Sequence, residues 1–162
     1  MLMVISGGQT GPDRAALEAA VATGMPYGGW CPKGGWAEDM PEPPGVLALY
    51  PDLRETPASA PEQRTDWNVR DSDALLVLVG EGGIDVSLGT MRAVQYAEEL
   101  RKPYVVVSAM SEEASSHAFD FLSAFSAPSF GVGGPRESES PGLQAASLKL
   151  LQPIFARMVA GA

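Results

Sequence analysis

The sequence predicts a three-layer α/β protein of Rossmann-like type, with helices on both faces of a mainly parallel sheet. Two apolar runs, Ala74–Val79 and Tyr104–Ser108, have the length and composition of strands that are buried on both faces. Segments with helical character alternate with such runs along the chain, an order that is typical of parallel sheets. At 162 residues the chain is long enough for one hydrophobic core, and we expect a single domain over residues 1–162.

The first elements expected are a strand at Met1–Ile5 and a helix at Pro12–Thr23. The proline suits the first position of a helix because its missing N–H would have no partner there, and Gly24 suits the position just after the helix. The next segment, residues 28–61, is rich in proline and glycine. We expect long surface loops in this segment, with one short strand at Val46–Tyr50.

Helices and strands are expected to alternate through the rest of the chain. Ser140 and Pro141 have the residue types that open a helix, and Pro153 is expected to kink the final helix rather than end it. The expected elements are a helix at Glu62–Asp71, a strand at Ala74–Val79, a helix from Thr90 to Arg101, a strand at Tyr104–Ser108, a helix at Glu112–Phe125, a strand at Ser129–Val132 and the final helix from Ser140-Pro141.

The composition excludes several classes of partner. A formal net charge of −9 repels a nucleic-acid backbone, although backbone N–H groups can still bind a small anion. No apolar stretch approaches the ~20 residues that cross a bilayer, and the first residues lack the pattern of a signal peptide. The single cysteine, Cys31, cannot form a disulfide within the chain, and the single histidine, His117, has no second ligand at metal-binding spacing. We therefore expect a cytoplasmic protein without a nucleic-acid, membrane or metal partner.

The strongest local motif is the turn Ser6-Gly7-Gly8-Gln9-Thr10-Gly11, which lies between the first strand and the first helix. Glycines permit a positive φ and the close approach of a ligand, and a helix N-terminus favours an anion. The spacing matches neither the dinucleotide fingerprint nor a Walker loop. The motif predicts a phosphate site, and the alternative that the glycines only form a tight turn stays open.

Further polar residues follow the later strands. Gly89 and Thr90 open a helix after a second glycine-rich loop, where Thr90 has two compatible roles, capping the helix or donating to a phosphate. Arg136 lies in a third loop and is either a phosphate clamp or a solvated side chain. Arg64 and Asn68 share one face of a predicted helix, and such a face is often only solvated. Trp30 and Trp36, in an earlier loop, either stack on a ligand ring or cover the core.

These motifs together resemble the SLOG superfamily of Rossmann-like proteins, which includes the lysine-decarboxylase-like and LOG proteins. Within that superfamily the chain is most similar to the group named for carrying molybdenum, which is related to the YpsA branch. The resemblance covers nearly the whole chain. It rests on Ser6–Ala15, Gly28–Gly34, Arg54–Thr56, Arg64–Ala74, Gly89-Thr90, Gly134–Ser138 and Pro141-Gly142.

The resemblance implies a nucleotide-type or molybdopterin-type ligand in a crevice between the loops, and a homodimer or higher homo-oligomer. One departure bears on catalysis. The phosphoribohydrolase relatives carry a glutamate three residues after the Gly-Thr of the second loop, where this chain has Ala93. The pair Gly82-Gly83 is also separated from Gly89-Thr90 by five residues, more than in the tight loop of those enzymes.

The leading hypothesis is therefore a protein that binds or carries a phosphate-containing, nucleotide-like ligand, with the molybdenum cofactor as one candidate. The alternative is an enzyme that cleaves or transfers an N-glycosidic bond, and a third interpretation is a sensor domain whose ligand controls assembly. The sequence leaves catalysis open and favours binding. The candidate binding residues are Gly7, Gly8, Gln9, Thr10 and Gly11 around the phosphate, Gly89 and Thr90 opposite, Arg64 and Arg136 for charge, and Asp13 or Asn68 for ligand hydroxyls or ring edges.

Overall fold

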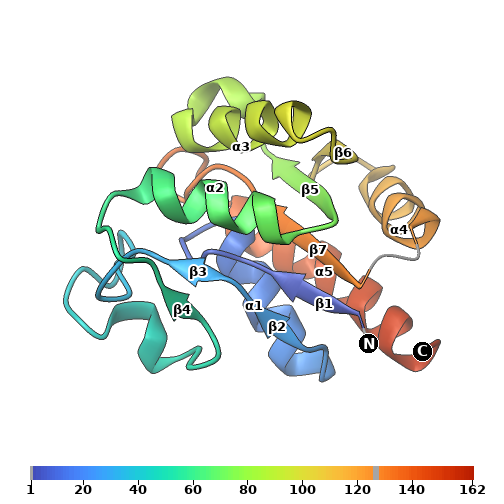
Figure 1. The fold of residues 1–162 in the computed structure, drawn as a ribbon. Coiled ribbons are helices and arrows are strands. Elements are labelled where there is room, and N and C mark those ends of the chain that lie inside the picture. Colours follow the sequence, from blue (N-terminus) through green and yellow to red (C-terminus); the bar gives the residue numbers. More distant parts are fainter. Residues whose placement is uncertain (1, 126–127) are drawn as a thin grey trace.

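Five parallel strands form the central sheet, in the order β2-β1-β7-β5-β6 (Figure 1). The computed structural model describes residues 2–125 and 128–162. The strands are β1 (Met3–Ile5), β2 (Tyr27–Gly28), β5 (Ala74–Val79), β6 (Tyr104–Ser108) and β7 (Ser129–Gly133). The predicted parallel α/β sheet is confirmed, although the part of the first strand expected at Met1 lies outside the described residues.

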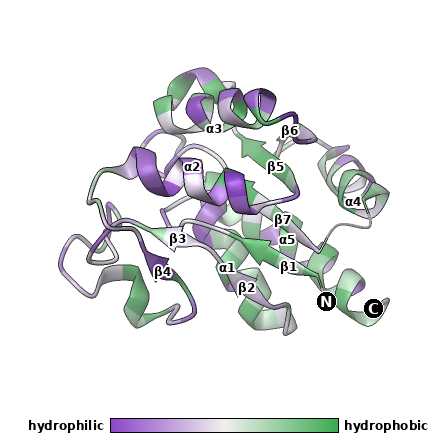
Figure 2. Cartoon of the chain, in the orientation of Figure 1, coloured by the Kyte–Doolittle hydropathy of each residue, from purple (hydrophilic) through white to green (hydrophobic). Residues whose placement is uncertain are grey.

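Helices cover both faces of the sheet. On one face lie α1 (Pro12–Thr23), α4 (Ala114–Ala124) and α5 (Leu143–Ala160), and on the other α2 (Pro61–Asp71) and α3 (Leu88–Glu99). Strand β5 shows why its sequence is uninterruptedly aliphatic. Leu76 and Leu78 pack in the core under α1, α4 and α5, whereas Leu75, Val77 and Val79 pack under α2 and α3. Figure 2 shows the central strands as hydrophobic and much of α2 as hydrophilic.

Residues 28–61 differ from the expected surface loops. They contain a second, two-stranded parallel sheet of β3 (Trp30–Cys31) and β4 (Arg54–Glu55), and a 3-10 helix, η1 (Gly45–Ala48). The expected strand at Val46–Tyr50 is wrong, because this segment turns as η1 and then caps it. Cys31 and Val46 are fully buried in a small third cluster with Leu17.

Three smaller differences have local causes. The final helix begins at Leu143 rather than at Ser140-Pro141, because Gly142 adopts the left-handed conformation just before it. Helix α3 begins two residues earlier than expected, after a 3-10 helix, η2 (Gly83–Val86), and its N-cap is Ser87. Strand β6 is an edge strand, so Val106 is 40 % exposed and not buried on both faces. Pro153 lies inside α5, as expected.

Helices α2 and α3 run side by side in the same direction (Figure 1) and are joined at two places. In the middle, Arg92 of α3 donates two hydrogen bonds of 2.8 and 2.7 Å to Asp66 of α2. At the far end, the ammonium of Lys102 donates to the carbonyl oxygen of Val69 at 3.0 Å and to those of Arg70 and Ser72. The N-terminal ends of the two helices are therefore the ends that frame a space between them.

Strands β1, β5 and β7 end at the same edge of the sheet, so the three glycine-rich loops meet there. Parallel α/β sheets bind their ligands at this edge, outside the carboxyl ends of the strands. Within residues 2–125 and 128–162, no helix is long and apolar enough to cross a membrane.

Candidate functional site

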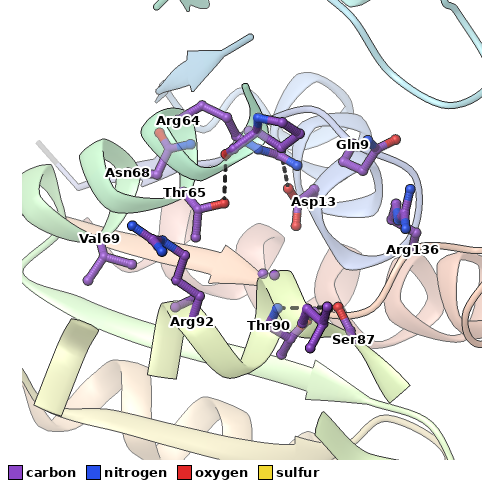
Figure 3. Close-up of a pocket in the computed structure, with 18 of the residues that line it drawn as sticks. Gln9, Asp13, Arg64, Thr65, Asn68, Val69, Ser87, Thr90, Arg92 and Arg136 are labelled. Atoms are coloured by element: carbon purple, nitrogen blue, oxygen red, sulfur yellow. Dashed lines mark hydrogen bonds and ion pairs between the residues drawn. The ribbon is translucent and has the colours of Figure 1, made fainter. Parts of the chain in front are cut away.

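A cleft of about 620 Å³ lies at this edge of the sheet, between α2, the start of α3, the end of β7 and the first loop (Figure 3). This volume falls in the range of small-molecule sites. Most of the residues predicted from the sequence line it, although they come from four separate segments of the chain. The predicted residues in its wall are Gly7, Gln9, Asp13, Arg64, Asn68, Gly89, Thr90 and Arg136.

Three predicted residues, Gly8, Thr10 and Gly11, do not line the cleft. A Cβ on Gly8 would lie 2.7 Å from Cγ2 of Val46, in the small third cluster. The Thr10 hydroxyl donates to a carboxylate oxygen of Glu38 at 2.5 Å. The N–H of Gly11 donates to the side-chain oxygen of Gln144 at 2.9 Å. These residues hold the first loop in place from behind, and a direct role in ligand binding stays a prediction.

Gln9 lines the cleft, but its side-chain oxygen already accepts two hydrogen bonds. They come from the N–H of Thr10 at 3.0 Å and from the N–H of Glu38 at 2.9 Å. Arg14 makes a second connection to the same segment, because its guanidinium bonds the carbonyl of Gly8 and both carboxylate oxygens of Asp39. The first loop is therefore fixed to residues 38–39, a role of Arg14 that the sequence analysis missed.

Asp13 is the buried carboxyl group of the cleft. It lies in the first turn of α1, its side chain is 13 % exposed, and its Oδ2 is 3.4 Å from Nη1 of Arg64 (Figure 3). Burial raises the pKa of Asp13 from 3.8 to about 6, against the opposing effects of Arg64, Arg14 and the backbone N–H groups of Gln9 and Asp13 itself. The carboxylate of Asp13 thus faces N–H groups that a phosphate would otherwise use.

Every arginine of the cleft has a carboxylate partner. Arg64 pairs with Asp13, and Arg92 pairs with Asp66. Arg136 lies 3.4 Å from Glu139 and 3.7 Å from Glu38. The arginines predicted to supply positive charge are therefore already neutralised in large part, and the backbone must contribute to holding an anion.

The start of α3 supplies that backbone. The Ser87 hydroxyl accepts the N–H of Thr90 at 3.2 Å and the Thr90 hydroxyl at 2.9 Å, so Thr90 is occupied in the helix cap. The N–H groups of Leu88 and Gly89 come before that of Met91, which donates to the carbonyl of Ser87, and no hydrogen bond from them is found within the described part of the chain. Leu88 and Gly89 both line the cleft, so two donors lie beside it at the positive end of a twelve-residue helix.

Asn68 and Trp30 join β3 to α2, whereas Trp36 lines the cleft. The Asn68 side chain accepts from the N–H of Trp30 at 2.7 Å and donates to its carbonyl at 2.8 Å, which fixes β3 against α2. Trp30 packs edge-on against Trp67, with ring centroids 4.7 Å apart, and is absent from the cleft wall. Trp36 does line the cleft, so of the two tryptophans left open by the sequence it is the one available to a ligand ring.

Part of the cleft wall was not predicted from the sequence. An apolar rim at η2 and α3, and the bare end of β7, had no motif of their own. The glycines within the Gly131–Gly134 stretch were the available signal, because glycine inside a strand often marks close approach of another group. The additional lining residues include Thr65, Val86, Leu88, Arg92, Gly131, Gly133 and Glu139. Among the described residues, no three of His, Cys, Asp and Glu are placed to hold a metal ion.

The parallel sheet and the cleft at its carboxyl edge define a Rossmann-like α/β protein with a site where such folds bind ligands. The family model of the circularly permuted YpsA SLOG family matches residues 4–155, so the chain belongs to that family. This agrees with the resemblance found in the sequence.

A similar solved structure is that named "Putative molybdenum carrier protein" from Syntrophus aciditrophicus. It shares 33 % identity and a TM-score of 0.82, over 94 % of this chain and 93 % of that one. A short-chain dehydrogenase from Streptomyces avermitilis has 14 % identity and a TM-score of 0.35, over 98 % of this chain and 83 % of that one. No curated protein matches the chain.

Proposed function

We propose that the cleft binds a phosphate-bearing, nucleotide-like ligand, and that the protein holds or carries this ligand. The observation that carries the proposal is the start of α3, where Leu88 and Gly89, whose backbone N–H groups have no partners in the described chain, line a cleft of about 620 Å³. The name of the similar Syntrophus protein makes the molybdenum cofactor one candidate cargo. Its pterin ring, which is rich in N–H donors, suits a cleft that contains a buried carboxylate and an available tryptophan.

Gly89 supports this place for the phosphate. A Cβ there would meet no atom within 4 Å, and its backbone is ordinary helix, so nothing inside the protein requires a glycine. Glycine near a helix start costs up to ~1 kcal/mol relative to alanine. A Cβ on a helix points toward the N-terminus, which here is the proposed phosphate position. The missing side chain is explained if a ligand occupies that space.

The first loop is a weaker phosphate cradle than its sequence predicts. Its N–H groups at Gln9 and Asp13 face the carboxylate of Asp13, and two of its three glycines point away from the cleft. We therefore place the phosphate at Gly89 rather than within Gly7–Gly11. The loop instead forms the closed end of the cleft.

The experiment is a calorimetric titration of the protein with adenosine monophosphate, alongside a thermal-shift panel of nucleoside monophosphates, dinucleotides and molybdopterin. Ligand at a hundred times its dissociation constant should add ~2.7 kcal/mol to the free energy of unfolding. Gly89→Ala should weaken binding at least about tenfold while raising thermal stability, because the new methyl group favours helix and occupies the phosphate position. A flat response throughout the panel at millimolar ligand would contradict the proposal.

Gly161→Ala is the matched control. Gly161 caps α5 with an ordinary φ of −88°, is exposed and does not line the cleft. This substitution should leave nucleotide affinity unchanged. An equal loss of affinity in both variants would show that the effect of Gly89→Ala does not arise at the phosphate position.

One observation favours a second candidate function, the cleavage or transfer of an N-glycosidic bond. The carboxyl group of Asp13, with a pKa of about 6, is poised for proton transfer near neutral pH. Ala93 lines the cleft at the position where hydrolytic relatives carry glutamate, and this argues against the same chemistry here. We expect no free adenine from adenosine monophosphate. Adenine release that scales with protein concentration and is abolished by Gly89→Ala would establish the enzyme.

The expected homodimer or higher homo-oligomer and the cytoplasmic location also remain proposals. Native mass spectrometry of the purified protein tests the first, and the same measurement shows whether cargo is retained.

A further inference from the structure

We propose that Asp13 accepts a hydrogen bond from a hydroxyl or ring N–H group of the ligand, so that the donor-bearing end of the ligand lies at α1 and its phosphate at α3. This inference rests on the proposed function, since it assigns an orientation to the ligand within the same cleft. It also names the ligand class: a molecule with an anionic end and a hydrogen-bond-donating end.

The two carboxylate oxygens of Asp13 face different surroundings. Oδ2 is directed to Arg64, with Nη1 at 3.4 Å. Oδ1 is directed to the end of β7, where a Cβ built on Gly133 would lie 3.7 Å from it. Asp13 and Gly133 both line the cleft. A ligand atom above the backbone of Gly133 can therefore reach Oδ1 without displacing Arg64.

Gly133 keeps this space open, although the protein does not need a glycine there. Its φ lies outside the left-handed region, and Oδ1 of Asp13 is the single described atom within 4 Å of an added Cβ. The neighbouring Gly131 and Gly134 differ, because a Cβ would meet Ser72 at 2.7 Å in the first and collide with the carbonyl of Leu78 in the second. Glycine weakens a strand interior unless another group approaches the backbone closely. At Gly133 that group is the ligand.

The polar side chains near the closed end are occupied only in part, since Nε of Arg64 is buried without a hydrogen-bond partner among the described residues. Asn68 uses both ends of its amide on the backbone of Trp30. Gln9 uses its oxygen on Thr10 and Glu38. A phosphate at this end would meet the carboxylate of Asp13, and like charges at close range repel. Oδ1 of Asp13 therefore suits a donor of the ligand, while the N–H groups at the start of α3 suit an anion, even though the carboxylate of Glu139 lies close enough to Ser87 for the Ser87 hydroxyl to lower the pKa of that carboxylate.

The charge on Asp13 gives the contact a pH dependence. The charged groups that act on its carboxyl are Arg64 from α2 and Arg14 from its own helix α1, and burial opposes them, so its pKa is about 6. Above that pH the carboxylate accepts a donor from the ligand, and below it the protonated group loses much of this capacity. A ligand phosphate has its own ionisation near pH 6, so the two effects must be separated by a variant.

The test is calorimetric titration at pH 5 and pH 8 with three probes: adenosine monophosphate, ribose 5-phosphate and inorganic phosphate. Asp13→Asn should lower the affinity for adenosine monophosphate about 10- to 100-fold at pH 8, because a charged acceptor is lost. It should change the affinity for inorganic phosphate less than about threefold. An equal loss for ribose 5-phosphate assigns the donor to a sugar hydroxyl, and a loss confined to adenosine monophosphate assigns it to the ring.

The pH dependence of binding is compared between the parent and Asp13→Asn. In the parent, the affinity for adenosine monophosphate should fall from pH 8 to pH 5 by more than it does in Asp13→Asn. The titration of the phosphate is common to both and cancels. Identical pH profiles would overturn the role of Asp13.

Gly133→Ala keeps the proposal testable if Asp13→Asn folds poorly. The added methyl makes an ordinary contact with Oδ1 and no strained backbone, so this variant should fold. Gly133→Ala should weaken the binding of adenosine monophosphate at least about tenfold and leave the affinity for inorganic phosphate unchanged. Binding of adenosine monophosphate as tight as the parent's in these variants would overturn the inference alone. Failure of the parent to bind any of the probes would overturn the proposed function, and the inference with it.

Discussion

Two groups of glycines lie at the cleft, those of the first loop and those at the start of α3 and the end of β7, and they serve different purposes. In the first loop a Cβ on Gly7 would collide with the guanidinium of Arg64, and Gly8 and Gly11 have positive φ values of 74° and 89°. Gly89 and Gly133, by contrast, have ordinary backbone conformations and room for a Cβ. The fold thus requires glycine at positions 8 and 11, whereas it does not require glycine at positions 89 and 133.

The comparison teaches that a glycine-rich turn before a helix is ambiguous when it is met as sequence. A glycine that the fold requires needs no ligand to explain it. A glycine that weakens a helix or a strand, without strain or crowding to justify it, needs a further reason. Gly89 and Gly133 are therefore better guides to the ligand than the more conspicuous motif at residues 6–11.

The largest effect is expected on folding, from a substitution in the first loop. Gly11→Ala combines a positive φ with a collision against the carbonyl of Pro135, and we expect it to lower the free energy of unfolding by about 3 kcal/mol or more. Urea denaturation followed by circular dichroism measures the change. If Gly11→Ala were as stable as Gly89→Ala, the fold would not require a glycine in the first loop, and the contrast between the two groups of glycines would be wrong.

The next effect concerns Asn68, which holds the small sheet against α2. Asn68→Ala leaves the N–H and carbonyl of Trp30 without their side-chain partner, and each unsatisfied buried group costs about 1–3 kcal/mol. We expect a loss of roughly 2 kcal/mol in unfolding free energy. The same denaturation experiment checks it, and an unchanged midpoint would mean that water replaces both bonds at no cost.

The pH dependence of stability sharpens the account of Asp13. Its pKa is raised from 3.8 to about 6 on folding, so the folded state binds the proton more tightly, and the stability gained from this is complete below about pH 4 and is lost as the pH rises through 6. The stability of the parent relative to Asp13→Asn should therefore fall between pH 4.5 and pH 7.5, by on the order of 1–2 kcal/mol. Paired denaturation curves at the two pH values measure this. A difference that stays constant would show that the carboxyl group is not perturbed.

The smallest effect is expected from Arg136, on the binding side. Its guanidinium already faces Glu139 and Glu38 and is partly exposed, so Arg136→Gln should change the affinity for adenosine monophosphate less than about threefold. Calorimetric titration of Arg136→Gln and Gly89→Ala with adenosine monophosphate compares the two losses of affinity. A loss larger than that of Gly89→Ala would move the phosphate from α3 to the third loop.

The sequence predicts the central layer of this fold well, for physical reasons. Strand β5 is buried on both faces and so appears as an uninterrupted aliphatic run, and Pro12 and Gly24 mark the two ends of α1. The two-residue strands β3 and β4 leave no such pattern, because contacts with Asn68 and with each other stabilise them rather than local propensity. The cap of α5 was misplaced because the left-handed conformation of Gly142 is set by the preceding turn.

The candidate site, like the fold, was predicted from the sequence only in part. Sequence adjacency brought Gly8, Thr10 and Gly11 into the prediction together with Gly7 and Gln9, but the side of a turn that faces a cleft is decided by packing against Val46 and Gln144. Arg92 was not predicted as a cleft residue and Trp36 was left between two roles, since their segments come together only in the folded chain. The burial that perturbs Asp13 is also a property of the assembled layers.

The three carbonyl contacts of Lys102 have a mechanical consequence for the cleft. They join α2 to the segment after α3 at the end remote from the proposed phosphate position, so Lys102 is a fulcrum for a rotation of α2, which the pair of Arg92 and Asp66 in the middle of the helices restrains. Helix α2 has 11 residues and is therefore about 16 Å long. A rotation of about 5° at the fulcrum displaces its free end by roughly 1.4 Å over this length. The width of the cleft mouth thus depends on an ammonium group outside the cleft wall as well as on the pair of Arg92 and Asp66.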